Sequence, residues 1–148
     1  MVTAVPEADA ASALARLLPR LSRFASIRLD EARPRISVTQ LYVLQRIVDG
    51  VRRGTDLARR IRVSGPTVSG IVDRLVAGGF AVREPDPTDR RAYAVTLTEA
   101  GRAAVADGDA RLARGIADLL HDASAADRAA LLRTCALIER ALDARVAS

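Results

Sequence analysis

Two short helix-like segments, joined by a tight turn and followed by an alternating hairpin, constrain the fold of this chain most. Residues 55–61 and 65–77 place apolar side chains at helical spacing. Residues 80–84 and 93–97 alternate instead, as strands do, and a polar, proline-rich stretch separates them. This order of periodicities predicts a helix-turn-helix followed by a β-hairpin with a polar loop at residues 85–91.

Capping residues indicate where the helices begin. Ser37 and Gln40 have the spacing of a capping box, and Ser124 starts a second one. Thr55 and Ser64 precede two further apolar runs as N-caps. We expect the faces that follow to be buried: Leu41, Leu44, Ile47, Val48, Leu57, Ala58, Ile61, Val68, Ile71, Val72 and Leu75, with Phe80, Val82, Val95 and Leu97 from the hairpin.

Long helical segments flank this unit on both sides. Apolar residues recur from Ala8 to Ala32, where Pro19 is expected to kink or restart the helix and Pro34 to end it. Thr98 begins a fifth helix. A sixth carries a seam at coiled-coil-like spacing, formed by Leu131, Cys135, Ile138 and Leu142. These segments hold more apolar surface than a monomer of 148 residues easily covers, which favours a dimer.

The charge is uneven and all of the basic residues are arginine. The chain has 23 Arg, no Lys and 18 acidic residues, for a net charge of +5. Residues 52–62 hold five Arg against one acid, Asp56, whereas the final 48 residues hold seven of each. Guanidinium groups suit phosphate, so this predicts a polyanionic partner for the helix-turn-helix. An incidental run of surface charge is the competing interpretation.

The outward face of residues 65–77 is small and polar, which suits a close approach to base edges. A helix fits the major groove of DNA, and a β-ribbon beside it reaches the adjacent minor groove. An ordinary solvated helix face is the alternative. The outward residues are Gly65, Pro66, Thr67, Ser69, Gly70, Asp73 and Arg74.

Composition excludes several other classes. Aromatic residues make up 3% and Trp is absent, which disfavours binding of nucleic acid by stacked aromatic platforms. One cysteine, Cys135, and one histidine, His121, exclude a disulfide framework and multi-thiolate or two-histidine metal sites. With no glycine-rich phosphate loop either, we expect no enzyme, cofactor or metal. Cys135 is expected to be a buried core residue. Neither a signal peptide nor a membrane span is expected, so the predicted location is cytoplasmic.

From about Leu14 onward, the chain resembles the MarR (multiple antibiotic resistance regulator) family of transcription factors. Residues 64–75, SGPTVSGIVDRL, are similar to its recognition helix, and residues 79–83 to the strand that enters its wing. Residues 89–91, Asp-Arg-Arg, followed after five residues by Leu-Thr-Glu-Ala-Gly at 97–101, are similar to its wing signature. Smaller similarities lie at Thr39, Gln40, Leu44 and residues 55–58.

The resemblance implies a mainly α fold with a small β-hairpin wing. It implies a winged helix-turn-helix over residues 36–100, with dimerisation helices at 1–35 and 101–148. The expected assembly is a homodimer that binds double-stranded DNA at pseudo-palindromic operators, typically as a repressor. Many members release DNA when they bind a small phenolic or anionic effector.

The resemblance also assigns roles to individual residues. Base-edge and nearby phosphate contacts are expected from Ser64, Pro66, Thr67 and Ser69. Arg74 is expected to reach the DNA backbone. Arg90 and Arg91 lie in the wing, and the family places the residue at position 91 in the minor groove. Asp89 is expected to orient that arginine by an ion pair, with simple capping of the loop as the alternative.

Four residues are candidates for an effector pocket between the dimer region and the DNA lobe: Phe24, Arg28, Tyr42 and Arg46. Aromatic rings and guanidinium groups suit an aromatic acid, although ordinary packing also accounts for them. The peroxide-sensing branch of the family uses a cysteine near the N-terminus, and Cys135 lies elsewhere. Two alternatives stay open: a winged-helix regulator without a small-molecule effector, and a helical protein-binding module that has lost DNA binding.

Overall fold

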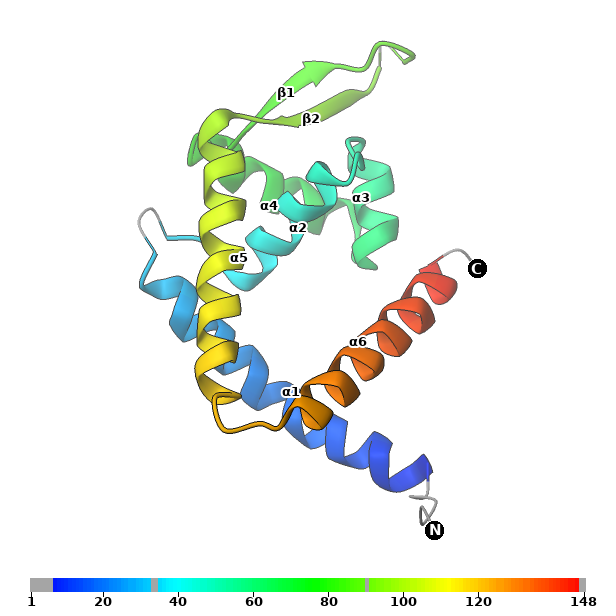
Figure 1. Cartoon of the computed structure of the whole chain (residues 1–148). Coiled ribbons are helices and arrows are strands. Elements are labelled where there is room, and N and C mark those ends of the chain that lie inside the picture. The colour runs from blue at the N-terminus through cyan, green and yellow to red at the C-terminus, as the bar shows by residue number, and fades with distance from the viewer. Residues whose placement is uncertain (1–6, 33–34, 90, 147–148) are drawn as a thin grey trace.

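The computed structural model describes residues 7–32, 35–89 and 91–146, so the expectations for Pro34 and Arg90 lie outside the described residues. The described chain is mainly helical with a two-stranded antiparallel hairpin (Figure 1), which confirms the predicted fold class. The elements are α1 (Glu7–Asp30), α2 (Val38–Val48), α3 (Gly54–Ile61), α4 (Gly65–Ala77), β1 (Ala81–Pro85), β2 (Tyr93–Leu97), α5 (Glu99–Leu119) and α6 (Ala125–Val146).

A single core lies beneath α2, α3, α4 and the hairpin. Leu44, Leu57, Val72, Leu75 and Val95 are fully buried there, and burial of such side chains is the main source of stability. The predicted buried stripe of α4 is confirmed in full. The prediction for α2 is wrong at one position: Val48, in the last turn, is 57% exposed, and Val43 is buried instead.

Side-chain caps fix where most helices begin. The Ser37 backbone N–H donates to Oε1 of Gln40 at 2.9 Å, and the Gln40 N–H donates to Oγ of Ser37 at 3.1 Å, which confirms the capping box. Ser64 caps α4 as predicted. Thr55 is not a cap, because α3 begins at Gly54 with Arg53 in the N-cap position.

Arg53 takes this position because the segment before α3 is tied to the hairpin. The Val95 N–H donates to the carbonyl of Arg52 at 2.8 Å, and the backbone of Arg53 forms an isolated antiparallel β-bridge with Ala94. The chain is therefore extended up to Arg53 and turns helical immediately afterwards. The start of α3 and the second strand of the wing are consequently held together.

The hairpin pairs Ala81 with Leu97 and Arg83 with Val95. Leu97 and Val95 are buried as predicted, but Val82 is 41% exposed and Ala81 is buried in its place. The prediction failed because Phe80 belongs to the turn after α4 and not to the strand, so the inward alternation is shifted by one residue.

The hairpin joins α5 through a close backbone contact. Thr98 caps α5 by accepting the Gly101 N–H at 3.0 Å, while its hydroxyl donates to the Gly79 carbonyl at 2.7 Å. A Cβ at Gly101 would lie 2.0 Å from the Phe80 carbonyl oxygen, so only glycine fits there. Gly79 has a φ of +75°, the conformation that ends α4 as predicted.

The terminal helices lie to one side of the lobe that α2, α3, α4 and the hairpin form. Helix α1 runs through Pro19 without restarting, and it packs on α5 and α2 near its end. Helix α6 stands away from most of the chain (Figure 1). At its far end, Nη2 of Arg60 lies 3.2 Å from Oδ1 of Asp143. Among the described residues, none of the helices combines the length and apolar character that crossing a bilayer requires.

The apolar seam of α6 is mostly uncovered within the chain. Leu131 is 41% and Leu142 60% exposed. Cys135 is exposed too, so the expectation of a buried thiol is wrong for the single chain. The reason is that, within the described ranges, no other helix packs extensively on α6. On α1, Leu17 and Leu18 are likewise exposed.

Candidate nucleic-acid interface

Helix α4 presents most of the predicted reading residues to solvent. Ser64, Pro66, Thr67 and Arg74 are exposed, whereas Ser69 is half-buried. The opposite face of the helix carries the buried stripe, which holds α4 against the core. Burial of the opposite face therefore fixes the position of α4, and its exposed face is accessible to a binding partner.

The first turn of α4 is organised by its own side chains. Oγ of Ser64 accepts the Thr67 backbone N–H at 3.3 Å and lies 2.7 Å from Oγ1 of Thr67. Pro66 occupies the start of the helix, where its fixed φ suits the first turn. Ser64 therefore acts as a cap that also orients the Thr67 hydroxyl.

The acid on this face is neutralised by the hairpin. Oδ1 of Asp73 lies 2.7 Å from Nη1 of Arg83, and the Arg83 guanidinium stacks 4.8 Å above the Tyr93 ring. The hydrogen bond with Asp73 raises the pKa of Arg83. Asp73 thus links α4 to β1, and its pairing reduces the repulsion that a free carboxylate would exert on phosphate. Arg74 forms no ion pair with any described residue.

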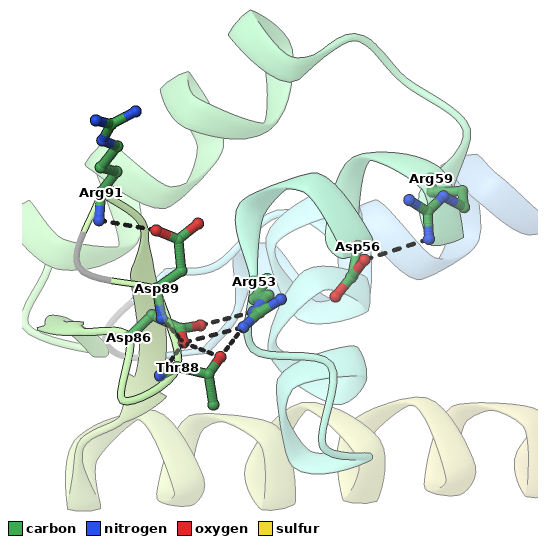
Figure 2. A network of polar contacts seen from close by, with 7 residues as sticks. All are labelled: Arg53, Asp56, Arg59, Asp86, Thr88, Asp89 and Arg91. Carbon is green, nitrogen blue, oxygen red and sulfur yellow. Dashed lines mark hydrogen bonds and ion pairs between the residues drawn. The ribbon is translucent and has the colours of Figure 1, made fainter.

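The centre of the wing is a buried carboxylate, Asp86, held by Arg53 (Figure 2). Nε of Arg53 lies 2.6 Å from Oδ2, and Nη2 lies 3.0 Å from Oδ1. Arg53 also donates to the hydroxyl of Thr88. The hydrogen bond from Arg53, followed by those from Thr88, holds the pKa of Asp86 well below its usual range. Asp86 in turn raises the pKa of Arg53.

Asp86 also folds the loop around itself. Its Oδ1 accepts the backbone N–H groups of Thr88 at 2.8 Å and of Asp89 at 3.1 Å. The Thr88 hydroxyl donates to the same oxygen at 2.7 Å. These short-range hydrogen bonds are those of an Asx turn. The Arg53 guanidinium, from a distant part of the sequence, binds the same carboxylate.

The side chain of Asp89 caps the following residues of the loop by a hydrogen bond to the backbone. Its Oδ1 accepts the Arg91 backbone N–H at 3.0 Å, and the Arg91 side chain points away from the network (Figure 2). No ion pair joins the side chains of Asp89 and Arg91, and Arg90 lies outside the described residues. The geometry therefore favours the capping alternative for Asp89.

Arg91 lines a hollow together with the starts of α3 and α4. The hollow measures about 350 Å³. Its lining brings together residues from the wing, the start of α3 and the start of α4: Arg53, Gly54, Thr55, Gly65, Val68, Asp89, Arg91, Ala92 and Tyr93. The wing arginine and the start of α4 thus border one concave surface.

The basic run at 52–62 is less free than its composition implies. Arg53 pairs with Asp86, Arg60 with Asp143, and Arg59 with Asp56 at 3.3 Å. Within the described part of the chain, Arg52 and Arg62 form no ion pairs. Arg62 adopts a φ of 57°, in the turn between α3 and α4.

No local pattern predicts the pairing of Arg53 with Asp86, since 33 residues separate them. The spacing of Asp86 and Thr88 is typical of an Asx turn and was the one available signal. That signal predicts the turn and not the partner, which comes from the packing of α3 against the wing.

The effector candidates form two separate pairs. The Arg28 guanidinium lies 5.2 Å from the Phe24 ring centre on α1, and Arg46 lies 5.2 Å from the Tyr42 ring centre on α2. Arg28 lies 4.0 Å from Asp118, and Arg46 lies 3.0 Å from Asp49. Nε of Arg46 is buried and has no hydrogen-bond partner in the described part of the chain.

Residues 34–92 match the model of the MarR family. The chain is 36% identical over 101 residues to the HTH-type transcriptional repressor NicR of Pseudomonas putida. That match covers 67% of this chain and spans 63% of the NicR sequence.

Solved structures with the same fold cover nearly the whole chain. A MarR family protein from Bacillus stearothermophilus has a TM-score of 0.79 at 18% identity, covering 92% of this chain and 94% of that one. RV1404 from Mycobacterium tuberculosis has a TM-score of 0.78 at 24% identity, covering 93% and 95%. A mutant MarR from E. coli complexed with operator DNA has a TM-score of 0.69 at 22% identity, covering 86% and 91%.

Proposed function

The chain belongs to the MarR family, and from this premise we propose that it is a dimeric, sequence-specific DNA-binding transcriptional regulator. Residues 36–100 are assigned to DNA binding, and residues 1–35 and 101–148 to dimerisation. Repression is the proposed mode of action, because the relative NicR is a transcriptional repressor. The protein is not assigned any catalytic role.

The observation that carries this proposal is the shared surface of α4 and the wing. Ser64 and Thr67 are exposed on a helix whose opposite face is buried, and Arg91 borders the same hollow as the start of that helix. A helix of this kind can enter the major groove while the arginine reaches the minor groove beside it. Base edges would be read by Thr67 and Ser69, with Arg74 and Arg91 contacting the backbone and minor groove.

A dimer is proposed because the terminal helices expose apolar side chains. Leu17 and Leu18 on α1 and Leu131 and Leu142 on α6 are each more than one-third exposed. Large exposed apolar patches mark surfaces that a partner covers. A second copy supplies matching faces, and a two-fold dimer matches a pseudo-palindromic operator.

Release by a small aromatic or anionic effector is the finer proposal. Among the described residues, Nε of Arg46 has no hydrogen-bond partner, and the Arg46 guanidinium lies beside the Tyr42 ring. This supports the proposal, because a buried donor without a partner is costly and a carboxylate could satisfy it. The test is a thermal-shift screen of small aromatic acids against wild type and Arg46→Gln. A stabilising acid that also releases DNA, and acts on the wild type alone, would support the proposal. Stabilisation of both proteins would place the effector elsewhere.

The experiment for the main proposal is a footprint on the DNA upstream of the chain's own coding sequence. We expect protection of two half-sites about one helical turn apart, with two protein copies per duplex measured by analytical ultracentrifugation. Protection at random positions, or none at low salt, would contradict sequence-specific binding. One copy per duplex would contradict the dimer.

A further inference from the structure

Three successive contacts lead from the start of α3 to Arg91. Arg53 binds both carboxylate oxygens of Asp86, Asp86 accepts the Asp89 N–H at 3.1 Å, and Asp89 accepts the Arg91 N–H at 3.0 Å (Figure 2). We propose that Arg53 is a positioning residue that sets, through Asp86 and Asp89, the direction in which Arg91 leaves the wing. This inference rests on the proposed DNA-binding function.

Arg53 is already engaged within the protein. Its Nε and Nη2 donate to Asp86, and Nη2 also donates to Thr88. A guanidinium paired in this way has little net charge to offer to phosphate, even though its side chain is 43% exposed. Its position in the basic run at 52–62 therefore does not make it a DNA contact.

Asp86 depends on this partner because its side chain is only 5% exposed. A buried carboxylate that loses its counterion is strongly destabilised in place, so the loop must rearrange to hydrate it. The N–H groups of Thr88 and Asp89 point at the same oxygen and would move with it. Lysine cannot replace Arg53 fully, since an ammonium group lacks the planar, two-pronged geometry.

The direction in which one substitution changes the affinity for DNA distinguishes a positioning role from a simple effect of charge. Asp86→Asn removes a negative charge from a DNA-binding surface, which by electrostatics alone tightens binding. Positioning predicts the opposite, a loss of about tenfold in affinity, comparable to one lost interface contact. The matched control is Asp56→Asn, which removes a carboxylate that pairs with Arg59 and makes no hydrogen bond to the described residues of the wing. We expect that control to bind as tightly as the wild type or more tightly.

The coupling between Arg53 and Arg91 is tested by a double-mutant cycle. Arg53→Gln should weaken binding about tenfold in the wild type and have little effect in the Arg91→Ala background. Equal factors in both backgrounds would show that Arg53 contacts DNA independently and would overturn the inference. Arg53→Lys keeps the charge, so full recovery of affinity by that variant would overturn it as well.

A readout without DNA distinguishes this inference from the function on which it rests. Amide hydrogen exchange should accelerate at Thr88, Asp89 and Arg91 in Asp86→Asn, while α2 and α5 keep their protection and the variant stays folded by circular dichroism. Affinity is measured on the duplex upstream of the chain's own coding sequence. If the wild type binds no DNA, the proposed function fails, whatever the exchange data show. If the loop opens while affinity for DNA stays unchanged, the positioning role is wrong.

Discussion

At the scale of single residues, the polar face of α4 and the wing arginine are expected to read DNA in different ways. Thr67 and Ser69 lie on the helix assigned to the major groove, where every base pair has a distinct edge. Thr67→Ala and Ser69→Ala should change which operator is preferred, each lost contact costing about 1–3 kcal/mol. Selection from a randomised duplex library measures this. An unchanged consensus for both variants would remove these residues from base readout.

Arg91 should act with less dependence on sequence, because the minor groove presents a degenerate pattern and is read by its width. Arg91→Ala should weaken binding to all duplexes. Two copies per dimer should lower the salt slope by about two phosphate equivalents. Affinity is measured over a salt series for the wild type and for Arg91→Ala. An unchanged slope and affinity for Arg91→Ala would place this residue outside the interface.

Asp86 gives the stability of the protein a specific pH dependence. Its pKa is lowered in the folded state, chiefly by the hydrogen bond from Arg53, so its contribution is present above the unfolded pKa of about 3.9 and declines as the pH falls below it. The melting temperatures of wild type and Asp86→Asn should therefore differ at pH 6 and converge on acidification below about pH 4. A constant difference across that range would show that Arg53 does not stabilise the ionised form.

At the scale of elements, two helix caps of similar chemistry should differ in function. Ser37 caps α2 and Ser64 caps α4, and loss of either should cost about 1 kcal/mol of unfolding free energy. Ser64→Ala also frees the Thr67 hydroxyl, so this variant should lose DNA affinity, whereas Ser37→Ala should bind normally once folded. Denaturant unfolding and binding measured on both variants test this. Equal losses of affinity would show that only general stability matters.

The elements were largely predictable because their signals are local. Capping boxes, the buried stripe of α4 and the glycine that ends it all act within a few residues, and all were confirmed. The errors lie where tertiary contacts decide. Arg53, and not Thr55, is the N-cap of α3, because the pairing with the wing keeps the chain extended up to Arg53. Val82 faces solvent because Phe80 belongs to a turn and not to the strand. The link from Arg53 to Asp86 joins distant segments and has no local signature.

At the scale of the whole molecule, we expect α6 to contribute to dimerisation and not to the folding of the helix-turn-helix core. Among the described residues, the core cluster includes none from α6, and Cys135 and Leu142 are exposed. Deleting residues 124–148 should leave the helix-turn-helix core folded but abolish the dimer, and the uncovered face of α1 should promote aggregation. Sedimentation and circular dichroism measure both effects. A truncated chain that remains a dimer with unchanged DNA affinity would show that α6 is dispensable.

In the proposed two-fold assembly, the two lobes bind DNA together. A dimer presents two copies of α4 and two wings, so the binding energy of one lobe is combined with that of the other. The contacts from Arg53 to Arg91 are inside each lobe and do not depend on the partner. The geometry of each lobe should therefore survive loss of the dimer, while tight binding of the operator should not.

Competition between two duplexes shows whether the chain binds DNA with sequence specificity. The labelled duplex from upstream of the chain's own coding sequence is bound at physiological salt and challenged with itself or with a scrambled duplex of the same composition. We expect the scrambled duplex to compete at least about a thousandfold less well, as for specific regulators. Equal competition by the two duplexes would show that the interaction rests on charge alone and would contradict sequence-specific binding.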